Sequence, residues 1–403
     1  MADTHKRMNI PPFAISTIPH IVFGNGVRRR LPELAQEFGR RVLLVTGQSS
    51  FPDSPAWPEL LQGLKALDMT WAHVTVRGEP SPQLADDMAR LFRDDGIDAV
   101  IGIGGGSVLD AAKAIAGLLR VNHSVMDYLE GVGPELPYEG PAVPFIAVPT
   151  TAGTGSEATK NAVLSAHGEQ GFKKSFRHEM LVAKVAVVDP ELLATCPPKL
   201  IAADGMDALT QLLESYVSLK ANPFTDALAM SGIRAARDGL LPWYHGEGDL
   251  AQHRADMGYA ALLSGITLAQ VGLGSVHGLA APLGAFFPIP HGVVCGTLVA
   301  SCSATNLRAL MQRAPDSPAL PRYAHVGKVL AQDMSLDDEA GRRVLLEILT
   351  AWTEELQLPR LSGFGMREAD IPRVVANCRG SSMKTNPVVL TDAEVAGILE
   401  SRL

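Results

Sequence analysis

The chain has 403 residues, of which 46% are hydrophobic and 19% are charged, and its formal net charge is −8. This length exceeds one ordinary core and predicts two domains, while the composition excludes a disordered chain. The negative charge and the lack of a dense basic run argue against a protein that binds nucleic acid.

The cysteines and the apolar stretches do not indicate export or a membrane. The first eight residues contain no apolar run, so we expect no secretory signal. The most apolar stretch, residues 99–119, contains Asp110 and Lys113, which favours a buried strand–turn–helix over a membrane span. The cysteines lack CxxC spacing and any framework pattern, which predicts reduced thiols: Cys196, Cys295, Cys302 and Cys378. We therefore expect a cytoplasmic protein without a membrane partner.

The first half of the chain alternates short β-branched runs with helical patterns. Strands are expected at residues 41–46, 98–103 and 144–148. Ser81 followed by Pro82 is typical of a helix start, and a further helix is expected over residues 108–119. Such alternation predicts a parallel sheet covered by helices.

The pattern changes to long helices after about Pro198. They are expected at residues 208–217, 226–239, 250–267, 293–311 and 340–355, with the turn-rich residues 189–198 at the junction. The sequence thus predicts an α/β nucleotide-binding domain over residues 1–197 and an all-helical domain over residues 198–403. The cleft between them is the expected ligand site.

Two loops rich in small residues follow predicted strands. Residues 101–107 contain three consecutive glycines, Gly104 to Gly106, before a helix whose free N–H groups suit a diphosphate. This is not the G-x-G-x-x-G fingerprint, and a tight turn without a ligand is the alternative. Residues 149–157 supply hydroxyls as well as glycines. Loops after successive parallel strands lie where open α/β sheets bind ligands.

Four side chains in the second half could hold one divalent cation. Asp207 and Gln211 lie four residues apart, on one face of a helix. His277 and His291 are fourteen residues apart, about 21 Å along a straight helix, which is too far for one ion. Three prolines between these histidines would end a helix and let the chain turn back: Pro282, Pro288 and Pro290. Cys295 and Cys302 have the spacing of an ordinary helical core.

These blocks together resemble the iron-containing (group III) alcohol dehydrogenases. The resemblance rests on Gly104-Gly-Gly-Ser107 with Asp110 and Lys113, on residues 149–157, 205–210 and 276–284, and on Pro290-His-Gly292. The blocks occur in the family order across most of the chain. The resemblance implies a dehydroquinate-synthase-like fold, interconversion of an alcohol with an aldehyde or ketone, and a homo-oligomer of two or more chains.

The resemblance also assigns roles to individual residues. Asp207, His277 and His291 match metal ligands of the family, with Fe²⁺ the expected ion and Mn²⁺ or Zn²⁺ as alternatives. A second set matches cofactor contacts: Gly105, Gly106, Ser107, Asp110, Thr150, Thr151, Thr154, Thr159, Lys173 (or Lys174) and Leu268.

Three departures from the family pattern bear on function. Gln211 replaces a histidine; it either ligates through its amide oxygen, which would favour harder ions, or only forms hydrogen bonds, and a third reading is an empty site. Ala281 replaces a histidine suited to proton relay, so water, ribose hydroxyls or another side chain must carry protons. Gly47 replaces an aspartate that would repel a 2′-phosphate, so Gly47, Gln48 and Ser49 predict that NADP(H) is accepted and even preferred to NAD(H). A turn remote from the ribose is the alternative.

The expected function is a metal-dependent, NAD(P)(H)-linked oxidoreductase acting on a small alcohol, aldehyde or ketone. The cation would act as a Lewis acid on the substrate oxygen, and the cofactor would supply the redox chemistry. Two alternatives remain: a metal-independent reductase resembling maleylacetate reductase, and a non-catalytic nucleotide-binding relative. The substrate itself is not identified by the sequence.

Overall fold

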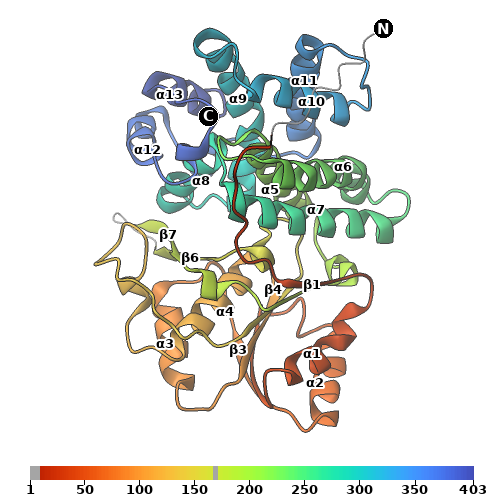
Figure 1. Ribbon diagram of the computed structural model, residues 1–403, viewed down its shortest axis with the longest axis vertical. Coiled ribbons are helices and arrows are strands. Elements are labelled where there is room, and N and C mark those ends of the chain that lie inside the picture. Colours follow the sequence, from red (N-terminus) through yellow and green to blue (C-terminus); the bar gives the residue numbers. More distant parts are fainter. Residues whose placement is uncertain (1–9, 167–170) are drawn as a thin grey trace.

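The computed structural model describes residues 10–166 and 171–403. The first eight residues, from which we expect no secretory signal, lie outside this range. In Figure 1 the α/β half lies below the helical half, and residues 10–19 run along the helical half before entering the sheet. A hydrogen bond from the Ser16 backbone N–H to Gln270 Oε1 (2.7 Å) ties this segment to the helical half.

Six parallel strands form the sheet of the α/β half, in the order β1-β8-β5-β4-β2-β3. Their bounds are β1 His20–Phe23, β2 Arg41–Thr46, β3 Thr70–Thr75, β4 Ala99–Gly104, β5 Phe145–Pro149 and β8 Val185–Val188. Gly104 pairs with Pro149, so the loops that follow β4 and β5 leave the sheet side by side. This is the arrangement expected for the two glycine-containing loops.

Helices cover both faces of this sheet because its central strands are apolar on both sides. Val42 and Leu44 pack with α1 (Leu31–Gln36) and α2 (Ala56–Ala66). Leu43 and Val45 point the other way, toward α4 (Gly106–Leu118), with α3 (Pro82–Phe92) alongside. Ser81 caps α3 by accepting the Leu84 N–H, as its sequence predicted.

A hairpin that the sequence did not predict lies beside α4 (Figure 1). It consists of the antiparallel strands β6 (Asn161–Ala166) and β7 (Phe172–Arg177), of which β7 also contacts the helical half. The sequence gives only a weak strand signal here, because the adjacent Lys173 and Lys174 interrupt the apolar pattern of β7. The hairpin places several cations near the boundary between the two halves.

The second half of the described chain is helical from Pro198 onward. Its helices are α5 Pro198–Val217, α6 Pro223–His245, α7 Leu250–Val271, α8 Ser275–Phe286, α9 His291–Arg313, α10 Ala319–Leu330, α11 Asp338–Glu355, α12 Ile371–Asn377 and α13 Asp392–Glu400. One hydrophobic core joins them. The predicted helices are found, and most of them extend further at their ends than the apolar pattern suggested.

The turn between the two predicted metal histidines differs in one respect from the expectation. Pro282 lies inside α8 and does not end it. The chain turns instead at residues 287–290, which include Pro288 and Pro290, and α9 then begins at His291. Pro282 is buried with most of α8, so tertiary packing offsets the helical hydrogen bond that the proline removes.

Helix α9 is long and apolar enough to cross a membrane, and α7 with α8 would qualify as a span bent by 99°. However, 78% of the most apolar window of α9 is buried inside the protein. This is the behaviour of a core helix, and α9 carries two of the side chains described next.

Candidate metal centre and cofactor cleft

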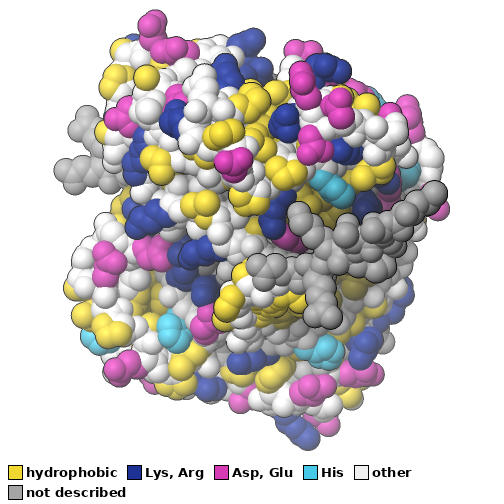
Figure 2. Space-filling view, turned by 45° about the horizontal axis from the view of Figure 1, so that its top comes forward, with side chains coloured by type: hydrophobic (Ala, Val, Ile, Leu, Met, Phe, Trp, Pro, Cys, Tyr) yellow, Lys and Arg dark blue, Asp and Glu magenta, His cyan; other side chains and the backbone are white. Residues whose placement is uncertain are grey.

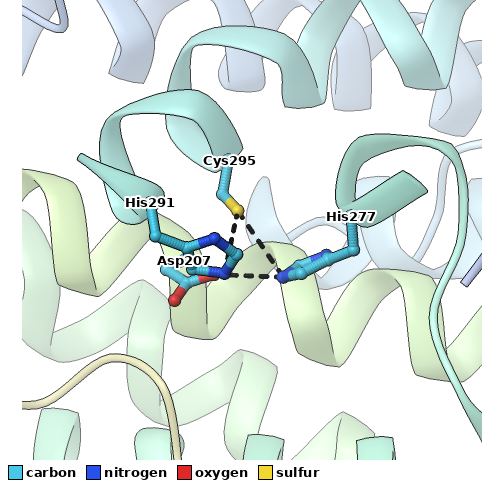
Figure 3. A group of neighbouring side chains, drawn as sticks. All are labelled: Asp207, His277, His291 and Cys295. Atoms are coloured by element: carbon cyan, nitrogen blue, oxygen red, sulfur yellow. Dashed lines mark hydrogen bonds and ion pairs between the residues drawn. The ribbon is translucent and has the colours of Figure 1, made fainter. Parts of the chain in front are cut away.

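Three helices bring one carboxylate, two imidazoles and one thiol together. Asp207 comes from α5, His277 from α8, and His291 and Cys295 from α9. One ligand atom from each lies within 4.8 Å of all the others. Figure 3 shows the four side chains pointing toward one another. The structure thus brings three of the four predicted metal residues into one cluster and adds Cys295.

The distances within this cluster are those of groups that could share an ion. His277 Nε2 lies 3.2 Å and His291 Nε2 lies 3.8 Å from Asp207 Oδ1. Asp207 Oδ2 and His291 Nδ1 are buried and have no hydrogen-bond partner. Because a buried unpaired polar atom is costly, a bound cation would complete the carboxylate. Carboxylate, imidazole and thiolate are the usual ligands of such ions.

The protonation states of Asp207 and His291 also suit a cation. Burial alone would raise the pKa of Asp207, but His291 and His277 hold it at about 2, so Asp207 is a carboxylate. Burial lowers the pKa of His291 to about 4, so its imidazole is neutral at pH 7. Neutral imidazole is the form that binds metals.

Glu214, one turn beyond Gln211 on α5, orients His277. Its Oε2 lies 2.7 Å from His277 Nδ1, and its Oε1 accepts the Val276 N–H at 2.7 Å. Burial would lower the pKa of His277, but Cys295 and the carboxylates of Asp207 and Glu214 raise it well above the usual value. When Nδ1 donates to Glu214, the Nε2 lone pair faces the cluster, a common arrangement around metal-ligating histidines. The sequence analysis did not find Glu214.

Gln211 lies at the edge of this cluster. It is 2% exposed, it lines the cleft, and its Oε1 accepts a hydrogen bond from Ser264 Oγ at 2.8 Å. The side chain of His291 is 30% exposed, in contrast to Asp207 at 1%. The cluster is therefore open on the side of Gln211 and His291.

A cleft of about 840 Å³ between the two halves reaches this open side. Many of the predicted site residues line it: Gly106, Ser107, Asp110, Thr154, Thr159, Lys173, Gln211, Leu268, His277 and His291. Its cations are Lys160, Lys173, Lys174, Arg177, Lys220 and Lys384. In Figure 2, Lys and Arg side chains gather near the boundary between the upper and lower halves. Such a cleft suits a ligand with a diphosphate.

The glycine-rich loop and the hydroxyl-rich loop touch each other at the wall of the cleft. A Cβ on Gly106 would come within 2.8 Å of Thr154, and one on Gly105 within 3.2 Å of Thr151. The close approach explains why these positions lack side chains. The N-terminus of α4, whose first residue is Gly106, therefore opens directly into the cleft.

The buried side chain of Lys113 connects α4 to the hydroxyl-rich loop through hydrogen bonds. Its Nζ lies within hydrogen-bonding distance of four acceptors, namely Ser156 O and Oγ, Thr159 Oγ1 and Asn161 O, at 2.7–3.1 Å. Asp110 Oδ1 accepts a hydrogen bond from Ser156 Oγ at 2.6 Å. Burial lowers the pKa of Lys113 to about 8. Asp110 and Thr159, predicted as cofactor contacts, thus also belong to a buried network.

The remaining predicted residues lie outside the lining of the cleft. Thr150 is buried just after β5, and Asp204 on α5 is hydrogen-bonded to Thr151. Gly47, Gln48 and Ser49 follow β2, and the last two are exposed. They lie at the same edge of the sheet as the glycine loop, because β2 is paired in parallel with β4.

Comparison with known proteins agrees with this geometry. Residues 19–190 match the family "Iron-containing alcohol dehydrogenase", and residues 201–403 match "Fe-containing alcohol dehydrogenase family, C-terminal". The chain is 31% identical to long-chain-alcohol dehydrogenase 1 of Geobacillus thermodenitrificans (strain NG80-2), covering 98% of this chain and 97% of that protein. It is 29% identical to the NAD-dependent methanol dehydrogenase of Bacillus methanolicus, covering 96% and 98%.

A solved structure, that of a 1,3-propanediol oxidoreductase, superposes with a TM-score of 0.88 at 28% identity. The match covers 98% of this chain and 100% of that one. The dehydroquinate-synthase-like architecture expected from the sequence, an α/β half followed by a helical half, is thereby confirmed. The chain belongs to the iron-containing alcohol dehydrogenase family.

Proposed function

We propose that this protein is a metal-dependent oxidoreductase that transfers a hydride between NAD(P)(H) and a small alcohol and its aldehyde or ketone. The observation that carries the proposal is the cleft itself, because one wall presents the metal cluster and the other presents the N-terminus of α4 with the hydroxyl-rich loop. A substrate oxygen at the cluster and a nicotinamide on the opposite wall would meet there.

The cation would be held by Asp207, His277 and His291, with Fe²⁺ first and Mn²⁺ or Zn²⁺ as alternatives. The unpaired Asp207 Oδ2 supports this assignment. Such an ion supplies Lewis-acid chemistry, which lowers the pKa of an alcohol and polarises a carbonyl. Glu214 keeps the Nε2 lone pair of His277 directed at the cluster.

The remaining residues of the cleft would bind and orient the cofactor. Gly106 and Ser107 expose the backbone N–H groups of the first turn of α4 to the diphosphate. Thr154 lies against the same turn. Leu268 on α7 lines the cleft and would exclude water beside the nicotinamide. The cations of the cleft balance the charge of the diphosphate.

NADP(H) would be accepted as well as NAD(H), and preferred. Gly47, Gln48 and Ser49 place no carboxylate after β2. Arg77 lies two residues beyond Thr75, which pairs with Thr46 at the end of β2, and it is exposed. A 2′-phosphate at this edge of the sheet would meet neutral donors and a cation, with no carboxylate at position 47 to repel it.

We further propose a domain boundary between residues 197 and 198, a cytoplasmic location and a homo-oligomer. The boundary follows the last strand, β8, and precedes α5, which begins at Pro198. The outer edge of β1 and exposed Phe13 and Phe23 near the N-terminus are suited to contact a second chain.

A substrate panel tests the proposed activity. Short primary alcohols, diols, hydroxy acids and their carbonyl counterparts would be assayed by NAD(P)H absorbance with Fe²⁺, Mn²⁺ or Zn²⁺ present. We expect turnover that a chelator abolishes. Undiminished turnover after chelation would favour the metal-independent reductase, and cofactor binding without turnover on any compound would favour the non-catalytic relative.

A further inference from the structure

Cys295 closes the metal cluster on the side away from the cleft. Its Sγ lies 3.5 Å from His277 Nε2 and 3.8 Å from His291 Nε2. The side chain is fully buried. Cys295 lies four residues after His291 on α9, so the two project from the same face of the helix. The sulfur therefore belongs to the cluster as well as to the core, to which its spacing alone had assigned it.

These separations match those around a tetrahedral cation. With metal–nitrogen bonds of about 2.0–2.1 Å and a metal–sulfur bond of about 2.3 Å, nitrogen and sulfur ligands lie about 3.5 Å apart, and two nitrogen or oxygen ligands about 3.4 Å apart. The sulfur–nitrogen separations here are 3.5 and 3.8 Å. Those from Asp207 Oδ1 to the two imidazoles are 3.2 and 3.8 Å. All four lie within about 0.4 Å of the separations expected around a single central ion.

An independent sign of a ligand is the second carboxylate oxygen of Asp207. The residue is 0% exposed, and its Oδ2 has no hydrogen-bond partner. An anionic oxygen without a partner in the protein interior is strongly unfavourable. A cation bound to the Asp207 carboxylate would offset the charge of this buried group.

Gln211 occupies a different place from Cys295. Its amide oxygen already accepts a hydrogen bond from Ser264, and its side chain lines the cleft. Cys295 and Asp207 are fully buried behind the two histidines. The sulfur is thus placed to complete the ligand set from the core, while the amide oxygen of Gln211 is already bonded to Ser264.

We propose that the Cys295 thiolate is the fourth protein ligand of the cation and that Gln211 does not ligate it. The inference rests on the proposed function, in which Asp207, His277 and His291 hold a divalent ion. Metal uptake breaks the S–H bond of Cys295; the proton leaves to solvent, and the sulfur donates its electron pair to the ion without a change in oxidation state. A thiolate favours Zn²⁺ or Co²⁺ over Mn²⁺.

Metal spectroscopy on the whole chain tests the sulfur ligand. Protein stripped of metal would be loaded with one equivalent of Co²⁺ for absorption spectroscopy and of Zn²⁺ for X-ray absorption. We expect a sulfur-to-cobalt charge-transfer band, and one sulfur neighbour of zinc at about 2.3 Å. Cys295→Ser should lose both signals. Its Zn²⁺ affinity should fall at least about tenfold, because even removal of a residue that only hydrogen-bonds to a metal ligand costs about that much.

Two variants serve as controls. Cys302→Ser changes a buried thiol seven residues further along α9, and Gln211→Ala removes the amide. Both should keep the charge-transfer band. Bound metal with only nitrogen and oxygen neighbours in the unaltered protein would overturn the sulfur ligand and leave the three-residue site standing. Failure of the unaltered protein to bind Co²⁺ and Zn²⁺ would overturn this inference and the proposed function together.

Discussion

The two walls of the cleft differ in how completely the protein satisfies its own polar groups. On the cofactor wall, Lys113 meets four acceptors, and Asp110 is bonded to Ser156. On the metal wall, Asp207 Oδ2 and His291 Nδ1 are buried without partners. The polar groups of the cofactor wall are therefore hydrogen-bonded before any ligand binds, whereas those of the metal wall lack partners that an ion could supply.

The largest effect is expected from Asp207→Asn, which keeps the shape of the side chain and removes its charge. Loss of the ion would remove several kcal/mol of transition-state stabilisation, so kcat/KM should fall roughly 10³-fold or more. Metal content, measured on the same sample, should fall with it. Asp238→Asn, on an exposed carboxylate of α6 paired with Arg237, should change neither quantity. A fully active Asp207→Asn enzyme would show that the metal wall does not need the Asp207 charge to bind an ion.

Lys113→Met tests whether the hydrogen bonds of Lys113 stabilise the loops of the cofactor wall. The change leaves the buried Glu157 and the partly buried Asp110 without their cation, which we expect to lower the free energy of unfolding by about 3 kcal/mol or more. Denaturant unfolding would measure it. Lys328→Met removes an ion pair with Asp338, whose side chain is 52% exposed, and should cost less than about 1 kcal/mol. Equal losses in the two variants would show that Lys113 does not stabilise the loops of the cofactor wall.

Glu214→Gln sharpens the description of the metal wall. Without this carboxylate, the His277 ring is less firmly oriented and less basic, so Zn²⁺ affinity should fall about 10–100-fold. Competition with a chelator would measure the affinity. The matched control is Glu355→Gln, because Glu355 also pairs with a histidine, His245, but both are exposed. An unchanged affinity for Glu214→Gln would show that His277 needs no orienting partner.

Gly47→Asp gives the smallest expected effect and concerns only the choice of cofactor. A Cβ at position 47 would make an ordinary contact with Val108 at 3.8 Å, so the side chain fits. The added charge should repel a 2′-phosphate and lower kcat/KM for NADPH relative to NADH roughly tenfold, or ~1.4 kcal/mol. An unchanged ratio would mean that the turn after β2 lies away from the ribose.

Elements with strong local patterns could be predicted from the sequence. The strand at residues 41–46 and the helix after Gly106 follow from buried β-branched residues and a glycine turn. The hairpin β6–β7 could not be predicted, because residues such as Lys173 and Lys174 interrupt its apolar pattern. Pro282 was wrongly expected to end a helix, since local preference yields to the packing of α8.

The candidate site shows the same division. Asp207, His277 and His291 were found through motifs, and the structure brings them together. Glu214 and Cys295 were missed because their roles depend on how α5, α8 and α9 pack, which no local pattern encodes. The only local signal was the four-residue spacing of His291 and Cys295, the same spacing that separates Asp207 from Gln211.

Stoichiometric reconstitution of the metal-free protein tests most directly whether one cation completes the metal wall. Aliquots of Fe²⁺ or Zn²⁺ would be added anaerobically while alcohol oxidation and bound metal are measured on the same samples. We expect activity to start at background, to rise in proportion to bound metal and to level off at one ion per chain. Full turnover before any metal is added would contradict this expectation.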